Sequence, residues 1–254
     1  MQRILLAITI AVLIMTGLFA QGGQRGGQAA GPPPTPKAGA PIDLTGYWVS
    51  IVTEDWRFRM VTPPKGDFAS IPTNPAGVQA GNQWDPAKDE AAGEQCKSYG
   101  APAIMRVPGR VHVTWDNDTT LKVEADAGQQ TRLFHFGEFQ PPAGPATWQG
   151  NSVATWEVAG GGRGRGGLPA GGSLKVVTTG IRPGYLRKNG YPYSEKTSVT
   201  EYYDRTNETN GDSWLIVTTI VNDPVYLQQE FITSTHFKKQ ADAAGWNPQP
   251  CTAR

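Results

Sequence analysis

The chain has 254 residues, and its 23 lysines and arginines nearly balance its 22 aspartates and glutamates. A near-neutral chain lacks the basic excess of nucleic-acid-binding proteins, so we expect no nucleic-acid partner. Hydrophobic residues make up 38% of the chain and aromatic residues 9%, which excludes continuous disorder and predicts one sizeable core.

The first 20 residues form a short basic start followed by an apolar run. Arg3 precedes the uncharged segment 4–20, a pattern typical of a secretory signal peptide that is cut after Ala20. A retained membrane anchor is the alternative, although this run is at the short limit for spanning a bilayer. We expect cleavage, no stable membrane span in the mature chain, and a periplasmic or secreted location. Without Arg3 the charges balance, so net charge gives no electrostatic reason to bind anionic lipid.

Residues 21–41 are rich in glycine and proline and contain almost no large apolar side chain. Such a segment cannot bury enough surface to order itself, so we predict a disordered linker. A single folded domain is expected over residues 42–254.

Apolar and polar residues alternate with a period of two after residue 42, and no segment has a convincing helical stripe beyond a short turn around residues 86–94. Strands without crossover helices must pair antiparallel. We therefore predict an all-β fold, either an antiparallel lipocalin-like β-barrel or a closed sandwich of about ten strands. A barrel is preferred, because closure removes exposed edges. The predicted strands are 47–52, 56–61, 111–115, 121–126, 132–136, 152–157, 173–179, 197–204, 214–221 and 231–238.

Residues 62–103 are interrupted by prolines and glycines, and predict a long excursion across the barrel mouth before the third strand. Cys96 lies in this excursion and Cys251 lies in the C-terminal tail. In an oxidising compartment two cysteines favour one disulfide over two free thiols, and we predict that bridge.

The chain has three histidines, His112, His135 and His236, and each lies in a predicted strand. Inside a barrel they would converge into a metal site of three imidazoles with one open position. No close histidine spacing supports this, so satisfied polar histidines are favoured, and we predict no metal and no cofactor. The same histidines, or Tyr185 and Tyr193 activated by an arginine, are the candidate acid/base catalysts.

A second group of candidates combines cations with aromatic side chains. An arginine facing a barrel interior must be paired, either with a ligand that carries a carboxylate or phenolate or with internal carboxylates of the protein. Asp126, Glu157, Glu195 and Glu201 are the internal carboxylates. The candidate ligand-binding residues are Arg57, Arg59, Arg110, Trp115, Arg132, Phe134, Arg187 and Glu195.

Two sequence patterns resemble known proteins. The segment 148–157 reads W-x-G-x-S-x-x-x-W-E and residues 190–195 read G-x-P-x-S-E. Together with the segment 105–110, they resemble an uncharacterised family of secreted, β-rich bacterial proteins. That resemblance covers roughly residues 42–250 and implies no established activity. The segment 43–48, with its G-x-W start, is similar to lipocalin-like barrels and implies a ligand-holding barrel.

These observations support three hypotheses about function. The first is an exported protein that holds a small, partly apolar or aromatic ligand in a β-barrel cavity. The second is a cofactor-independent lyase, isomerase or hydrolase with a His or Tyr acid/base in the same cavity. The third is a structural module of the cell envelope without a cavity.

Overall fold

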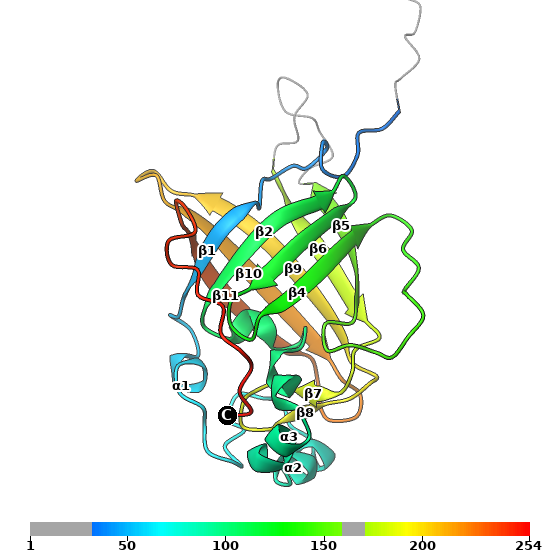
Figure 1. Cartoon of the computed structure of the whole chain (residues 1–254), viewed down its shortest axis with the longest axis vertical. Helices are drawn as coiled ribbons and strands as arrows, with labels where there is room; N and C mark the ends of the chain where they lie inside the picture. Colours follow the sequence, from blue (N-terminus) through cyan, green and yellow to red (C-terminus); the bar gives the residue numbers. More distant parts are fainter. Residues whose placement is uncertain (1–31, 159–170) are drawn as a thin grey trace, which may run out of the picture. The chain divides into compact units, whose positions relative to one another are not determined.

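Nine strands close into a barrel in the order β1-β11-β10-β9-β6-β5-β4-β3-β2 (Figure 1). The structure is a computed structural model, and it describes residues 32–158 and 171–254. It confirms the all-β barrel, whereas the predicted signal peptide and residues 21–31 lie outside the described residues. The strands are β1 (Gly46–Ile51), β2 (Arg110–Asn117), β3 (Thr120–Ala125), β4 (Gln130–Phe136), β5 (Asn151–Val158), β6 (Gly172–Thr179), β9 (Ser198–Asn207), β10 (Ser213–Asn222) and β11 (Phe231–Lys239).

One neighbouring pair, β4 with β5, is parallel, and the other eight are antiparallel. Antiparallel pairing reverses direction at every step, so a ring of antiparallel pairs alone needs an even number of strands. Nine strands therefore require at least one parallel pair. Residues 137–150 carry the chain back along the barrel, as a parallel connection must (Figure 1). The prediction of a purely antiparallel sheet is wrong at this pair.

Large side chains fill the barrel interior. The period of two turns one set of residues inward on every strand, and the largest members of this set are almost fully buried. They belong to one continuous apolar cluster. These side chains occupy the space in which a ligand cavity is predicted. The cluster includes Trp48, Leu121, Phe134, Leu174, Val176, Tyr203, Leu215, Val217 and Phe237.

One ion pair lies within this interior. Arg132 donates from Nη1 and Nη2 to the two carboxylate oxygens of Glu201, at 2.9 and 2.6 Å, and their side chains are 2% and 0% exposed. Tyr203 and Thr178 lie within hydrogen-bond distance of the same guanidinium. Burial alone would lower the pKa of Arg132, but the Glu201 carboxylate outweighs it and raises that pKa. Arg132 is thus neutralised by the protein, so its predicted role as a ligand anchor is corrected.

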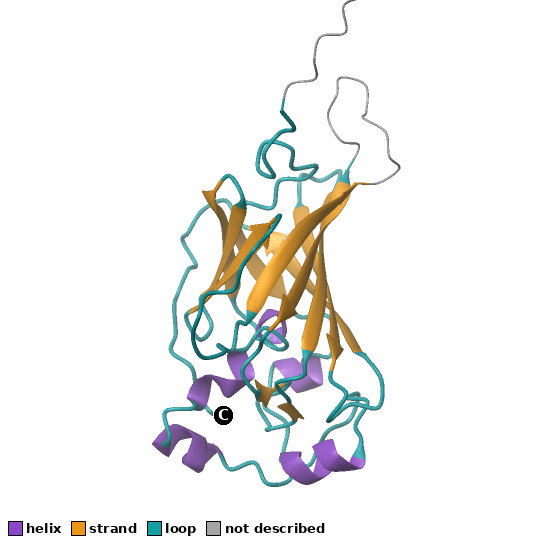
Figure 2. Ribbon diagram, turned by 90° about the vertical axis from the view of Figure 1, so that its right-hand side faces the viewer, coloured by secondary structure: helices purple, strands orange, loops and turns teal. Residues whose placement is uncertain are grey.

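The barrel end at which β1 finishes and β2 begins is covered by residues 52–109, 180–197 and 223–230, which we call the cap. Figure 2 shows its helices gathered at this end. A second apolar cluster, which includes Phe68, Tyr191 and Leu227, holds the cap together. Its elements are α1 (Trp56–Arg59), α2 (Pro75–Gly81), α3 (Pro86–Ala91), η1 (Gln95–Tyr99), η2 (Ile104–Arg106) and the hairpin of β7 (Gly184–Tyr185) and β8 (Pro192–Tyr193).

Local chemistry explains the helices of the cap. Asn74 accepts a hydrogen bond from the N–H of Gly77 at the start of α2, and Asp85 does the same for Ala87 at the start of α3. In both helices a proline occupies the first turn, where its missing N–H costs nothing. The predicted long excursion before the third strand is confirmed. Within it, α3 matches the turn expected around residues 86–94, whereas no helix was predicted at α2.

The predicted strand 56–61 is wrong. Asp55 adopts a left-handed conformation with φ of 49°, which ends the extended backbone after β1. The N–H groups of Phe58 and Arg59 then donate to the Asp55 carbonyl and form the single turn α1. Alternating residues here have no neighbouring strand to pair with, so their period of two does not produce a strand.

One end of the compact unit is fixed to the barrel and the other to the cap. This unit begins at Pro34, earlier than the predicted start at residue 42, because Trp156 Nε1 donates to the Pro36 carbonyl at 2.9 Å. At the other end, Cys251 forms a disulfide with Cys96 of η1 across a sequence separation of 155 residues. The predicted disulfide is confirmed.

We expect the substitution R132M to lower the free energy of unfolding by about 3–5 kcal/mol, because it leaves the Glu201 carboxylate buried without a partner. The double variant R132M/E201M removes both charges and should recover most of that loss. Denaturant unfolding of the three proteins tests this. A double variant no more stable than R132M would contradict a role for charge compensation.

We expect the variant C96S/C251S to lose about 4–5 kcal/mol of stability, because the bridge closes a long loop in the unfolded chain. The midpoint of guanidinium unfolding measures the difference from the oxidised parent. Equal midpoints for the two proteins would show that the bridge contributes nothing.

Candidate functional site

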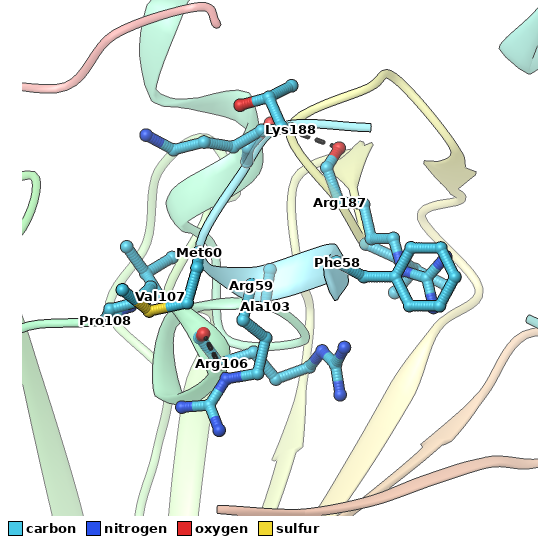
Figure 3. A pocket seen from close by; sticks show the side chains of 12 residues that line it. Phe58, Arg59, Met60, Ala103, Arg106, Val107, Pro108, Arg187 and Lys188 are labelled. Atoms are coloured by element: carbon cyan, nitrogen blue, oxygen red, sulfur yellow. Dashed lines mark hydrogen bonds between the residues drawn. The ribbon is translucent and has the colours of Figure 1, made fainter. Parts of the chain in front are cut away.

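A pocket of about 270 Å³ opens in the cap between α1, η2 and the segment that follows β7 (Figure 3). Three arginines from these three segments line it: Arg59, Arg106 and Arg187. They are 8%, 6% and 4% exposed. Phe58 and Met60 contribute apolar wall.

Two of the arginines have a carboxylate partner. Arg59 Nη1 contacts Glu54, and its Nε donates to the Arg106 carbonyl at 2.9 Å. Arg106 Nη2 donates to Asp55 at 3.0 Å. Arg106 Nη1, however, is buried and has no hydrogen-bond partner among the described residues. One buried N–H donor of Arg106 therefore has no acceptor among the described residues.

Arg187 has no carboxylate within ion-pair distance in the part of the chain that the structure describes. Its Nη1 donates to the Ala69 carbonyl at 2.6 Å, and its guanidinium carbon lies 4.3 Å from the centroid of the Phe58 ring. Figure 3 shows that ring against the guanidinium. The Arg187 Nε is buried without a partner among the described residues.

The electrostatics follow from this arrangement. Burial, together with the neighbouring Arg106, lowers the pKa of Arg59 and of Arg187 to about 10. The effect on Arg59 persists although Glu54 contacts it. Burial also lowers the pKa of Arg106, against the opposing effect of Asp55. A lowered pKa means that the positive form of the arginine is destabilised. A bound anion would stabilise that positive form and raise the pKa again. Three guanidiniums that share two carboxylates, with buried donors to spare, can bind a carboxylate or a phosphate.

Two turns place these side chains. The left-handed Asp55 starts α1, and so turns Phe58 and Arg59 into the pocket. On the other side, Gly190 closes a turn by donating its N–H to the Arg187 carbonyl at 3.1 Å. Gly190 has φ of 83°, and a Cβ on it would lie 2.0 Å from Trp84. Only glycine fits this turn.

The structure brings together Arg59 and Arg187 from the predicted ligand-binding residues. Arg57 is exposed and pairs with Asp67 at 3.0 Å. Arg110 packs against Gly245 of the C-terminal tail, and Glu195 is exposed in the cap. None of the last three lines the pocket.

The two aromatic residues among the predicted ligand-binding residues, Trp115 and Phe134, lie in the barrel and do not line the cap pocket. Phe134 is fully buried beneath Arg132, whose guanidinium carbon is 4.9 Å from the ring centroid. Trp115 is half-buried and stacks on Phe136 with 5.6 Å between ring centroids. Both rings pack against the apolar cluster of the barrel.

The three histidines do not converge. The period of two that turns Val111 and Val113 inward turns His112 outward, where it stacks on Tyr47 at 3.9 Å between centroids. His135 stacks on Phe139 at the same distance, also outside the barrel. The predicted meeting of imidazoles inside the barrel is wrong. No group of three or more His, Cys, Asp or Glu residues within 32–158 and 171–254 could hold a metal ion.

His236 lies in an outward-facing hydrogen-bonded chain. Its Nδ1 is 3.3 Å from Glu54 and its Nε2 is 3.4 Å from Ser234 Oγ. This is the order of a serine, a histidine and a carboxylate. Both distances are long for hydrogen bonds to a catalytic base, and the other oxygen of Glu54 is engaged by Arg59.

Neither candidate tyrosine lines the pocket. The Tyr185 hydroxyl donates to Asp89 at 2.9 Å, and burial with this carboxylate raises the pKa of Tyr185. Burial also raises the pKa of Tyr193, against the opposing charge of Arg182. The expected activation by a neighbouring arginine would lower these pKa values, so the structure does not support it.

Two basic lining residues, Arg106 and Lys188, are absent from the predicted site. Arg106 follows the apolar run 103–105, and a cation within a buried run needs a partner or a ligand, which is the signal that could have found it. Lys188 precedes the Asn189-Gly190 turn, and nothing in its neighbourhood distinguishes it from a solvated lysine.

Comparisons with protein-family models, with curated protein sequences and with solved structures find no match to this chain. The two resemblances noted in the sequence therefore stay predictions. Within the described residues, no helix is long and apolar enough to cross a membrane.

We expect the variant R187M to change the free energy of unfolding by less than about 1 kcal/mol, or to raise it. It loses the hydrogen bond to Ala69, a longer one to Ser70 and a contact with Phe58, but it also removes a desolvated charge that Arg106 repels. The variant R106M should cost more, because it leaves Asp55 without its partner. Denaturant unfolding in a buffer free of polyvalent anions tests this order, and the reverse order would contradict an uncompensated Arg187.

Proposed function

We propose that this chain is an exported protein that binds a small organic anion with an apolar or aromatic part. The observation that carries the proposal is the set of three buried guanidiniums in the cap pocket. Among the described residues, only Glu54 and Asp55 form ion pairs with them. A buried charge is retained at a cost in stability unless it is paired. A ligand carboxylate or phosphate would supply the missing negative charge.

The pocket also restricts the rest of the ligand. Its 270 Å³ is slightly below the usual range for drug-sized molecules, so the ligand is small. Phe58, Met60 and Leu186 line the pocket beside the arginines. Guanidiniums can bind an anionic group with two hydrogen bonds, while these apolar side chains contact a ring or a short alkyl part.

The Cys96–Cys251 disulfide supports an oxidising compartment, because such bridges persist outside the reducing cytoplasm. Together with the basic and apolar residues 1–20, it supports a periplasmic or secreted location for the proposed binding protein.

The enzyme hypothesis is the alternative, and the chain of Ser234, His236 and Glu54 is the observation that favours it. Ser234 lies within β11, not on the sharp strand-to-helix turn that exposes serine nucleophiles in hydrolases. The arginine pocket therefore supports binding better than the outer wall supports turnover. The packed barrel interior also suits a structural envelope module, and the cap pocket distinguishes binding from that role.

We expect phenyl phosphate to raise the melting temperature of the parent protein in a concentration-dependent way. Stabilisation reaches about 2.7 kcal/mol when the ligand is at a hundred times its dissociation constant. The variant R187Q should bind at least about tenfold more weakly, since hydrogen bonds to charged groups are worth about 1.5–3 kcal/mol.

The matched control for this experiment is R205Q. Arg205 is a partly buried arginine whose Nη1 donates to the Asp43 carbonyl at 2.6 Å, away from the pocket. Benzoate serves as a second probe, with a carboxylate in place of the phosphate. R205Q should keep the parent response to both phenyl phosphate and benzoate. No response in the parent to either anion, or an equal loss in R187Q and R205Q, would count against the cap pocket as the binding site.

A further inference from the structure

The turn α1 exposes apolar side chains next to the arginine pocket. Trp56, Met60 and Val61 are 65%, 60% and 68% exposed, the highest values among the large hydrophobic residues of the described chain. The Met60 N–H donates to the Trp56 carbonyl at 2.9 Å, so these two residues are stacked on one side of the turn. Met60 also lines the pocket, which makes the apolar surface continuous with its mouth.

Positive charge surrounds this surface. Five basic residues lie in or beside the pocket, against three acidic residues that pair with some of them, which leaves an excess of two positive charges. The near-neutral net charge of the chain hides this local concentration. The basic residues are Arg57, Arg59, Arg106, Arg187 and Lys188, and the acidic residues are Glu54, Asp55 and Asp67.

We propose that the anion held by this pocket is the phosphate of an anionic phospholipid, and that α1 docks the protein on the membrane surface. This inference rests on the proposed anion binding and specifies its ligand. Tryptophan and apolar side chains that flank basic residues are typical of segments that lie in the interface of a bilayer. Here Trp56 and Val61 would enter the interface while Arg187 and Arg106 bind the phosphate.

Charge complementarity favours lipid over a second copy of the chain. In a symmetric dimer the same surface meets itself, so the positive pockets would face each other and repel. An anionic bilayer offers both parts that the surface requires, a phosphate for the guanidiniums and an apolar layer for α1. A free phosphate ester would satisfy the pocket but leave Trp56 and Val61 in water.

Co-sedimentation with vesicles tests the proposal. One set of vesicles contains phosphatidylcholine alone, and the other contains equal parts of phosphatidylcholine and phosphatidylglycerol. The proteins are the parent, W56S/V61S, R187Q and the control V158S, which replaces an exposed valine at the far end of β5. All of them keep the same N-terminal segment, so any contribution from residues 1–20 is common to all.

We expect the parent and V158S to sediment with the anionic vesicles and not with phosphatidylcholine alone. W56S/V61S should bind the anionic vesicles at least about tenfold more weakly, because it removes apolar area from the interface, and R187Q should lose binding as well. Trp56 and Val61 do not line the pocket, so W56S/V61S should keep the parent melting response to soluble phenyl phosphate.

The two proposals fail separately. If the parent does not sediment with anionic vesicles, or if W56S/V61S sediments as the parent does, docking on lipid is overturned. A retained melting response to phenyl phosphate would still support anion binding by the pocket. If the parent does not respond to phenyl phosphate, the anion pocket itself is overturned. Sedimentation velocity tests for a dimer. If the parent dimerises with rising concentration and W56S/V61S does not, α1 binds a second copy of the chain, and docking on lipid is overturned.

Discussion

Charge compensation in the barrel interior distinguishes the barrel from the cap. Arg132 and Glu201 are almost completely buried and neutralise each other, and the apolar side chains around them fill the remaining space. A buried charged pair is tolerated when it is neutralised and well hydrogen-bonded. Here Tyr203 and Thr178 add contacts to the two terminal nitrogens of Arg132, while its Nε has no partner among the described residues. The two charges of this pair neutralise each other, so the barrel interior needs no ligand charge, and the proposed anion binding belongs to the cap.

The cap follows the opposite rule. Arg187 is as deeply buried as a core residue, yet only a carbonyl, a distant hydroxyl and an aromatic ring contact its guanidinium. Folding gains little from placing a third cation beside Arg106, and the lowered pKa of Arg187 reflects this cost. Residues that are poor for stability and well supported by their surroundings are typical of functional sites. The strained φ of Asp55 at the start of α1 belongs to the same region.

The sequence predicts the barrel well because its signal is local and repeated. The segment 121–126 was expected as a strand, and β3 spans Thr120–Ala125. The alternation also predicts which side chains of each strand point into the barrel. It does not predict which alternating segments pair with a neighbouring strand. Residues 56–61 alternate as the true strands do, but the left-handed Asp55 turns them into α1. The parallel pairing of β4 and β5 depends on the number of strands in the ring, which no single segment encodes.

The site is less predictable, because it depends on which buried cations lack partners. Arg59 and Arg132 look alike in sequence, each within an alternating run with aromatic neighbours. Only the register of β4 and β9 around the barrel places Glu201 against Arg132. Only the fold of the cap places Arg187 beside Arg106, with no carboxylate of the described residues within ion-pair distance. The predicted convergence of the histidines is wrong for a related reason. The apolar neighbours of each histidine, such as Val111 and Val113 beside His112, turn inward and so place the imidazole on the outer face of the barrel.

Net charge was misleading for the same physical reason. Charges interact over roughly 8–10 Å at physiological ionic strength, so a balanced total says nothing about a surface where basic residues outnumber acidic ones. The cap concentrates arginines from three segments that lie far apart in the chain, and the fold alone assembles them. A barrel filled with large side chains then serves as a rigid support, and its closed end presents the pocket and the exposed turn α1 on one surface. The fold thus joins two features that the sequence keeps apart: a cluster of arginines in a pocket and an apolar turn beside its mouth.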